Sequence, residues 1–94
     1  MTEKWIDLKG KIIIVTGGSM GIGASIVENL STNGAEVIIA DISNSEKFSN
    51  YKNVSFIECD VTKKDSVRNM VNKVVKEHQK IDGLVNNAGV NRAR

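Results

Sequence analysis

Short apolar runs alternate with helical patterns of apolar residues along this chain. Three runs, at 11–15 (KIIIV), 36–40 (EVIIA) and 54–59 (VSFIEC), are largely β-branched and are bounded by polar or turn residues. Such runs predict buried strands. A fourth, weaker run at 81–85 (IDGLV) is interrupted by Asp82 and Gly83. Because the first three runs stay apolar instead of alternating with polar residues, they favour a parallel sheet covered on both faces.

Two long helices are predicted between these strands. The first shows apolar residues at helical spacing and stops at Asn33-Gly34; its residues are Ile22, Ile26, Val27 and Leu30. In the second, Val67, Met70, Val71, Val74 and Val75 form one apolar stripe. Thr62, with Asp65 three residues later, resembles a capping box that opens this helix. Residues 43–53 are polar, and we expect one helical turn and a loop there.

The order of elements is therefore β-α-β-α-β-α-β. Connections between parallel strands are right-handed, so helices cover both faces of the sheet. The sequence predicts an α/β chain with part of a Rossmann-type, doubly wound parallel sheet in the strand order 3-2-1-4. In such sheets, ligands bind outside the carboxyl ends of the strands where the strand order reverses, here between the first and fourth strands.

A glycine-rich segment, TGGSMGIG at residues 16–23, lies directly after the first strand. Gly17 permits the tight exit from the strand, Gly21 permits close approach of a pyrophosphate, and Gly23 lets the helix pack closely. The free N–H groups of the first helical turn then face the phosphates. The segment predicts dinucleotide binding, and a plain strand-to-helix turn is the alternative.

A triphosphate-binding P-loop is the competing interpretation of these glycines. Gly18 and Gly23 have the required spacing, and Ser25 stands where the serine of that motif would be. The position between Gly23 and Ser25 is Ala24, so the lysine that reaches the β- and γ-phosphates is absent. This residue excludes the P-loop.

An acidic residue, Asp41, closes the second strand 24 residues after Gly17. A carboxylate at this place can accept both hydroxyls of an adenosine ribose and repels a 2′-phosphate. Neither Ile42 nor Met20 is basic, so neither would compensate that phosphate. The pattern favours NAD over NADP. The alternative is that Asp41 only caps the next turn.

Two further motifs follow the later strands: Asp60-Val61-Thr62 comes after the third strand, and NNAG at 86–89 comes after the fourth. Together with the glycine-rich segment, they make the chain resemble the short-chain dehydrogenase/reductase family. The resemblance implies that Asp60 contacts the adenine amino group and that NNAG steadies the sheet beside the cofactor. The candidate cofactor-binding residues are Thr16, Gly17, Ser19, Met20, Gly21, Ile22, Gly23, Asp41, Ile42, Asp60, Val61, Asn87, Ala88 and Gly89.

The resemblance also implies hydride transfer between nicotinamide and a secondary alcohol or carbonyl. It covers essentially the whole chain but only the first part of the family pattern, whose serine and Tyr-x-x-x-Lys pair come later. The one tyrosine, Tyr51, has Ser55 four residues on, so we assign no catalytic residue. Residues 1–94 are thus expected to form a dinucleotide-binding domain truncated before the catalytic part and inactive alone. A non-catalytic dinucleotide-binding module or a truncated gene product is the alternative.

Both ends of the chain look similar to polyol and sugar-phosphate dehydrogenases of the family. These ends are the leader WIDLKGK at 5–11 and the tail NNAGVNRAR at 86–94. The expected partners are NAD(H) and, in the complete enzyme, a small alcohol or ketone. A homo-oligomer is left open.

Composition narrows the function classes further. A chain of 94 residues with 40% apolar and 26% charged residues suits one globular domain. The 13 basic residues are nearly balanced by 11 acidic ones, which argues against a nucleic-acid surface. The longest aliphatic run, at 12–15, is far shorter than the roughly 20 residues that span a membrane. With one cysteine, no apolar leader and a lone His78, we expect a cytoplasmic chain without a disulfide or a metal site.

Overall fold

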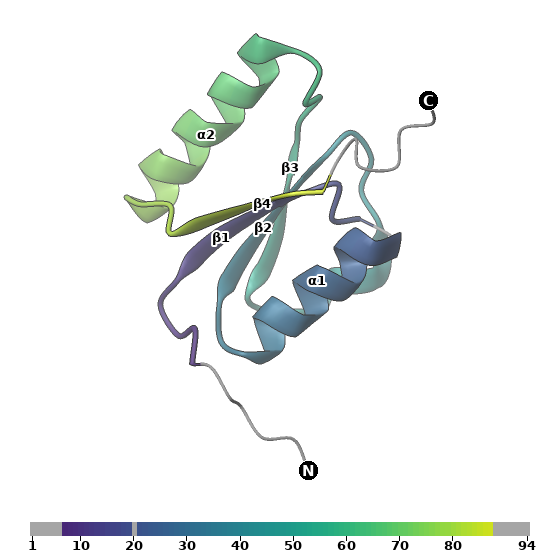
Figure 1. Cartoon of the computed structure of the whole chain (residues 1–94), viewed down its shortest axis with the longest axis vertical. Coiled ribbons are helices and arrows are strands. Elements are labelled where there is room, and N and C mark those ends of the chain that lie inside the picture. The colour runs from purple at the N-terminus through teal and green to yellow at the C-terminus, as the bar shows by residue number, and fades with distance from the viewer. Residues whose placement is uncertain (1–6, 20, 88–94) are drawn as a thin grey trace.

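Four parallel strands form one sheet in the order β3-β2-β1-β4 in the computed structural model, which describes residues 7–19 and 21–87. The strands are β1 (Ile12–Thr16), β2 (Glu36–Asp41), β3 (Val54–Glu58) and β4 (Gly83–Asn86). Helix α1 (Gly21–Thr32) precedes β2, the short 3-10 helix η1 (Glu46–Phe48) precedes β3, and α2 (Lys64–His78) precedes β4. The two long helices lie on opposite sides of the sheet (Figure 1). The predicted α/β fold and strand order are confirmed.

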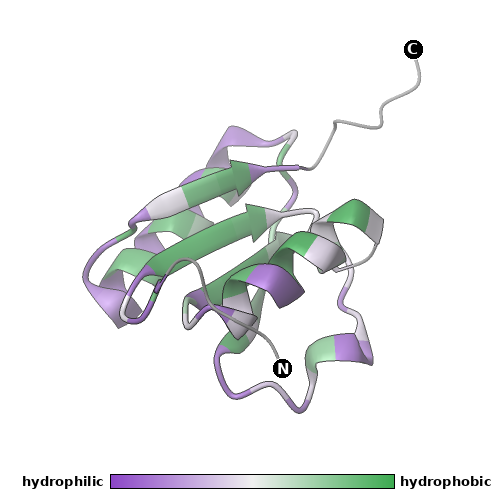
Figure 2. Ribbon diagram, turned by 60° about the horizontal axis from the view of Figure 1, so that its bottom comes forward, coloured by the Kyte–Doolittle hydropathy of each residue, from purple (hydrophilic) through white to green (hydrophobic). Residues whose placement is uncertain are grey.

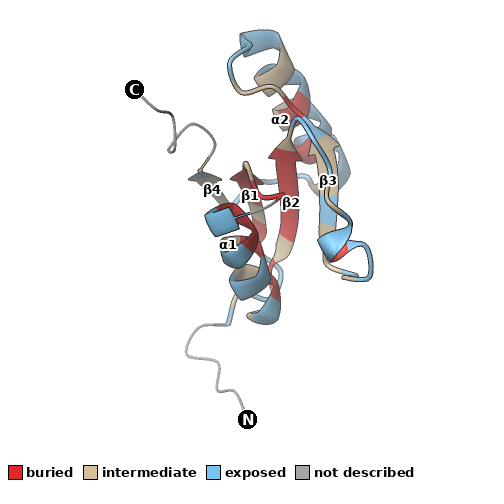
Figure 3. Ribbon diagram, turned by 90° about the vertical axis from the view of Figure 1, so that its right-hand side faces the viewer, coloured by how far each residue is buried: buried red, intermediate tan, exposed pale blue. Residues whose placement is uncertain are grey.

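The two central strands supply most of the core, and Figure 3 shows them buried between exposed edges. Alternate residues of β2 face opposite sides, so Val37 and Ile39 join the cluster under α1 while Ile38 and Ala40 join the cluster under α2. All four are at most 3% exposed. Burying a valine or isoleucine side chain contributes about 1.5–3 kcal/mol, so this strand ties both layers together.

The edge strands are less buried than the sequence predicts. No residue of Val54–Glu58 is buried, although the apolar run there indicated a buried strand; only Cys59, just after it, is 1% exposed. On the other edge, Leu84 of β4 is 60% exposed. The expectation of burial was wrong for β3 because an edge strand has a neighbour on one side only, whereas an apolar run says nothing about a strand's position in the sheet.

The start of α2 also differs from the prediction. Its N-cap is Lys63, which makes no side-chain capping hydrogen bond. Thr62 donates its hydroxyl to Oδ1 of Asp60 at 2.6 Å, so the predicted capping box of Thr62 with Asp65 is wrong. The physical reason is position, because α2 begins at Lys64 and Thr62 therefore lies one residue before the capping position. The predicted stop of α1 is confirmed, since Gly34 has φ +101.

The distribution of hydropathy follows this layering. Hydrophobic residues run along the strands, and hydrophilic residues gather in the connections and on the outside of α2 (Figure 2). In the part of the chain that the structure describes, neither helix combines the length and apolarity needed to cross a bilayer.

The beginnings of β1 and β4 are joined by a reciprocal pair of hydrogen bonds. The Ile12 N–H donates to Oδ2 of Asp82 at 2.7 Å, and the Asp82 N–H donates to the Ile12 carbonyl at 2.7 Å. The Lys80 ammonium lies 3.1 Å from the same carboxylate oxygen. Asp82, which interrupts the apolar run, therefore satisfies the first N–H of the central strand.

We expect the Asp82→Asn variant to lose part of the acid sensitivity of the fold. The Ile12 N–H, followed by Lys80, holds the pKa of the Asp82 carboxyl below its ordinary value of 3.8. The stabilisation is therefore complete above pH 3.8 and is lost as the pH falls through the lower folded-state pKa. Asn keeps an acceptor for Ile12 but cannot ionise.

Urea unfolding at neutral and at acid pH measures this difference. The control is Asp65→Asn on α2, where the carboxylate is 91% exposed and lies 3.8 Å from Arg68. An equal loss of unfolding free energy on acidification in the unaltered chain and in Asp82→Asn would contradict the assignment.

Candidate dinucleotide-binding site

The glycine-rich segment turns sharply between β1 and α1. Gly17 and Gly21 have φ of +67 and +66, which L side chains rarely adopt, and Met20 lies outside the described residues. A Cβ atom added at Gly21 would meet no atom within 4 Å. The backbone at Gly21 is therefore open to an approaching group, as a pyrophosphate site requires.

The third glycine, Gly23, has a packing role. A Cβ atom there would overlap the Gly17 carbonyl oxygen and lie 2.7 Å from Nδ2 of Asn87. The first turn of α1 is thus pressed against the glycine-rich segment and the end of β4. These observations fit the roles that the sequence predicts for Gly21 and Gly23.

The N-terminus of α1 suits an anion. The first N–H groups of a helix have no partners within it, and the first turn of α1 contains no acidic residue. Ile22 is 68% exposed, so it lies at the surface of this turn and not in the apolar face that its spacing indicated. Ile26 and Leu30 are half-buried, and Val27 is fully buried.

Residues after β4 are tied to the glycine-rich segment. The Asn87 N–H donates to Oγ1 of Thr16 at 2.9 Å, and its Nδ2 donates to the Gly17 carbonyl at 3.1 Å. Thr16 in turn donates to Oδ1 of Asn86 at 3.1 Å. Asn87 therefore holds the exit of β1 against the exit of β4. Ala88 and Gly89 of the same motif lie outside the described residues.

The carboxylate of Asp41 lies beside the glycine-rich segment. Its Oδ2 accepts the Ser19 N–H at 3.2 Å, and its Oδ1 accepts the Ile42 N–H at 2.7 Å. The bond from the Ile42 N–H is the local cap that the alternative interpretation predicts. The bond from the Ser19 N–H joins residues 22 positions apart. A carboxylate has about four acceptor sites, so two bonds leave capacity for the hydroxyls of a ligand. Ile42 is 66% exposed next to it.

The third acidic position, Asp60, follows β3. Hydrogen bonds from the side chain and then the backbone of Thr62, with the nearby Lys63, lower the pKa of its carboxyl. Both Thr62 bonds go to Oδ1, at 2.6 and 3.0 Å. The Asp60 N–H donates to Oγ of Ser66 at 2.8 Å. Val61 is half-buried and packs against the cluster under α2.

Sequence reasoning missed the side chains that hold these acids in place. Thr62 and Ser66 orient Asp60, and the segment after Asp41 is held by Ser19, whose hydroxyl donates to the Ser43 carbonyl at 2.5 Å. A threonine two residues after an aspartate is a recognisable signal for a local turn. The contact of Ser19 with Ser43 has no signal in the sequence because it spans 24 positions.

Other titratable residues lie elsewhere. His78 ends α2 and therefore lies near the amino end of β4, away from the carboxyl ends of the strands. Tyr51 lies between η1 and β3, where its ring packs edge-on against Phe48 at 5.0 Å. Over residues 7–19 and 21–87, the structure holds no group of three or more His, Cys, Asp or Glu side chains placed to bind a metal.

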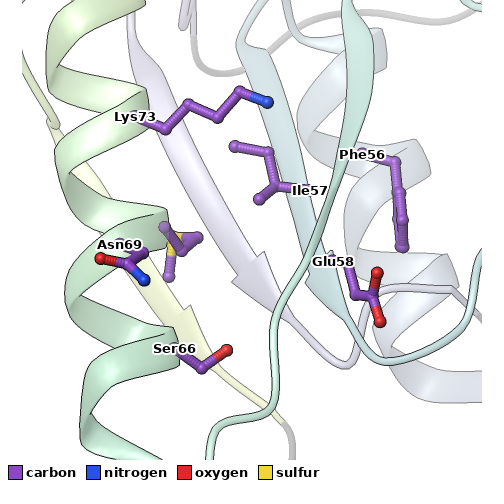
Figure 4. Close-up of a pocket in the computed structure, with 7 residues that line it drawn as sticks. Phe56, Ile57, Glu58, Ser66, Asn69 and Lys73 are labelled. Carbon is purple, nitrogen blue, oxygen red and sulfur yellow. The ribbon is translucent and has the colours of Figure 1, made fainter.

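A hollow of about 370 Å³ lies between α2 and β3, at the edge of the sheet (Figure 4). Ile57 points from β3 towards the helix, whereas Phe56 and Glu58 lie on the other side of the strand. The remaining lining residues belong to α2: Ser66, Asn69, Met70 and Lys73. The hollow shares no residue with the predicted cofactor site.

Comparison with known proteins identifies the family. The sequence profile described as "short chain dehydrogenase" matches residues 11–94. The chain belongs to the short-chain dehydrogenase family. The resemblance stated from the motifs is therefore confirmed.

Two curated relatives illustrate the range of the family. Sorbitol-6-phosphate 2-dehydrogenase of Klebsiella pneumoniae is 41% identical over 90 residues, which cover 96% of this chain and 34% of the relative. (+)-Borneol dehydrogenase 1 of Salvia officinalis is 42% identical over 87 residues, with 88% of this chain and 34% of the relative covered. This short-chain dehydrogenase chain therefore spans about a third of the length of the relatives it matches.

Solved structures agree with the fold. The ligand-free aldohexose dehydrogenase of Thermoplasma acidophilum is 41% identical with a TM-score of 0.78, over 88% of this chain and 31% of that one. Cj0485 dehydrogenase is 31% identical with a TM-score of 0.83, over 90% of this chain and 35% of that one. Both matches cover about nine tenths of this chain, so its fold agrees with these two dehydrogenases over most of its length.

Alanine substitutions at Gly23, which is closely packed, and at Gly21, which is open to solvent, are expected to destabilise the fold for different reasons. Gly23→Ala is expected to destabilise the fold by about 1–3 kcal/mol, because its Cβ would overlap the Gly17 carbonyl. The added Cβ of Gly21→Ala would meet no other atom, so this variant is expected to lose only the roughly 1–2 kcal/mol that a positive φ costs a residue with a side chain. Denaturant unfolding compares the two. A Gly23→Ala chain as stable as the unaltered one would refute the close packing of α1 on the segment.

Proposed function

We propose that this chain is the NAD-binding part of an oxidoreductase that transfers hydride between nicotinamide and a secondary alcohol or carbonyl carbon. The observation that carries the proposal is the position of Asp41, whose carboxylate lies at the end of β2 within 3.2 Å of the Ser19 N–H of the glycine-rich segment. An acid next to a phosphate-binding turn suits a ligand with a diphosphate and a neighbouring ribose diol.

In this proposal, each part of the site holds one part of NAD. The backbone around Gly21 and the first turn of α1 bind the pyrophosphate, aided by Gly17 and Gly23. Asp41 accepts the adenosine ribose hydroxyls, and its charge repels a 2′-phosphate. The remaining assignments follow the family resemblance: Asp60 and Val61 face the adenine, and Asn87, Ala88 and Gly89 support the cofactor beside β4.

The bound NAD would supply the hydride acceptor, and the residues of this chain would bind and orient it. The proton of the alcohol must leave through a general base, and we assign that base to no residue here. The hydroxyl of Tyr51 lies 3.4 Å from Oε2 of Glu28 on α1, remote from the carboxyl ends of the strands. In the complete enzyme, a polyol, a sugar or a sugar phosphate is the proposed substrate.

The substrate proposal rests on relatives. Sorbitol-6-phosphate 2-dehydrogenase and aldohexose dehydrogenase are named for polyhydroxylated molecules, in agreement with the likeness of the two ends of the chain. The second candidate function is a non-catalytic dinucleotide-binding module, since the site needs no catalytic residue to bind NAD. The coding sequence after codon 94 distinguishes them: a downstream Tyr-x-x-x-Lys supports the enzyme, and a stop codon supports the module. A cytoplasmic location and a homo-oligomeric state stay predictions.

We expect the chain to bind NADH more tightly than NADPH, and Asp41→Asn to narrow the difference. The variant loses a charged hydrogen bond to the ribose, worth roughly 1.5–3 kcal/mol, and loses the repulsion of a 2′-phosphate. Fluorescence titration with both cofactors measures the two affinities. The control is Asp7→Asn, because Asp7 is exposed and accepts a local N–H from Lys9 in the same way. Equal or tighter binding of NADPH by the unaltered chain contradicts the proposal.

The purified 94-residue chain is expected to show no dehydrogenase turnover with any alcohol. A positioned general base contributes about 10²–10⁴-fold to such reactions, and the one histidine of the sequence, His78, ends α2 far from the carboxyl ends of the strands. Substrate positioning, worth up to about 7–11 kcal/mol, also needs a pocket.

Absorbance of NADH, followed with a panel of polyols, sugar phosphates and simple secondary alcohols, tests this expectation. The control is Gly21→Val, which places a side chain against the proposed pyrophosphate. Turnover that survives repurification and disappears in Gly21→Val would show that the catalytic group lies within this chain.

A further inference from the structure

Within residues 7–19 and 21–87, Ser19 is the residue of the glycine-rich segment whose polar groups bond both to the last residue of β2 and to the chain after it. Its N–H donates to Oδ2 of Asp41, and its hydroxyl donates to the Ser43 carbonyl at 2.5 Å. Ser19 is 3% exposed, so its hydroxyl is directed into the protein. The sequence prediction that Ser19 binds the cofactor does not account for these two contacts.

These contacts belong to a series along the end of β2. The Gly17 N–H donates to the Ala40 carbonyl at 2.9 Å, the Ser19 N–H reaches Asp41, and the Ser19 hydroxyl reaches Ser43. Three residues at the end of β2 and just after it, Ala40, Asp41 and Ser43, are thus held against one turn. Ile42, between the last two of them, is 66% exposed, and its side chain adds little to the position of this segment.

The first two contacts in this series are donated by backbone N–H groups, so they do not depend on the side chain at position 17 or 19. The hydroxyl of Ser19 is therefore the only side-chain donor in the series, and it acts on the residue two positions after Asp41. Loss of this bond would leave Asp41 held by β2 and by the Ser19 N–H, but it would remove the hydrogen bond that joins Ser43 to the glycine-rich segment. The carboxylate would then sample more orientations.

From this geometry we infer that Ser19 is a positioning residue for cofactor selectivity: its hydroxyl fixes the 41–43 segment, so that the Asp41 carboxylate faces the adenosine ribose. The inference rests on the proposed function and deepens it. Ser19 acts through Asp41 and does not itself touch the ribose. The same fixed carboxylate that accepts two hydroxyls also repels a 2′-phosphate, so the tether affects NADH and NADPH in opposite directions.

The test compares Ser19→Ala with Ser31→Ala. Ser31 is a matched control, because it is also buried and its hydroxyl donates a single hydrogen bond, to Oδ1 of Asn53 at 2.8 Å, at the far end of α1. Titration with NADH and NADPH gives the ratio of the two affinities for each variant. We expect Ser19→Ala to weaken NADH binding about three- to tenfold, as for the loss of one ordinary hydrogen bond, without weakening NADPH binding. Ser31→Ala should leave the ratio unchanged.

A second measurement needs no cofactor. The Ile42 N–H donates to Oδ1 of Asp41, so its hydrogen exchange reports how firmly the segment is held. Exchange at Ile42 is expected to be faster in Ser19→Ala and unchanged in Ser31→Ala. The inference would be overturned if Ser19→Ala kept both the NADH-to-NADPH affinity ratio and the Ile42 exchange rate of the unaltered chain. An equal change of the affinity ratio in Ser19→Ala and Ser31→Ala would also overturn it. If the unaltered chain binds neither cofactor, the proposed function is wrong, and exchange at Ile42 still decides whether the tether exists.

Discussion

The close contact between Gly23 and the exit of β1 is the constraint on which the carboxyl edge of the sheet depends. Where other residues carry a Cβ atom, Gly23 has the Gly17 carbonyl oxygen and the Asn87 amide. This contact sets how near α1 can approach the sheet, and it brings the first helical turn beside the end of β4. Val27, one turn further along α1, is then fully buried against the sheet. Because Gly23 has no Cβ atom, the turn after β1, the first turn of α1 and the end of β4 can all be in contact.

The polar side chains of this edge are held by hydrogen bonds to the segments that surround them. Asn87 bonds to Gly17, Asp41 accepts from Ser19, and Asp60 is oriented by Thr62. In a parallel sheet the carboxyl ends of adjacent strands meet at one edge, so each of these bonds fixes a loop that the strands alone leave undetermined. Groups fixed before a ligand arrives lose less conformational freedom on binding, which is the physical basis of preorganisation.

The sequence predicted the architecture well because the relevant signals are local. Apolar runs, helical spacing and Asn33-Gly34 each act within a few residues, and the right-handed crossover rule then places helices on both faces of the sheet. The predictions that failed, and the contacts that were missed, depend on which partner a side chain bonds to, on the place of a strand in the sheet, or on residues far apart in the sequence. Thr62 bonds to Asp60 instead of capping α2, β3 is an edge strand without burial, and the bond from Ser19 to Ser43 spans 24 positions. No local pattern encodes such contacts, although a glycine motif and an acid at the end of a strand still locate the candidate site.

The strand order also separates the two halves of the candidate site. The acids Asp41 and Asp60 lie at the carboxyl ends of β2 and β3 on one side of β1, while the amides of Asn86 and Asn87 lie at the carboxyl end of β4 on the other. A ligand that crosses the glycine-rich segment would meet negative charge at one end and uncharged polar groups at the other. Beyond β4 the described sheet ends, and Leu84 there is 60% exposed. In the proposed function, the residues on the acidic side hold the adenosine half of the cofactor, and the chemistry of the opposite half is assigned to no residue of this chain.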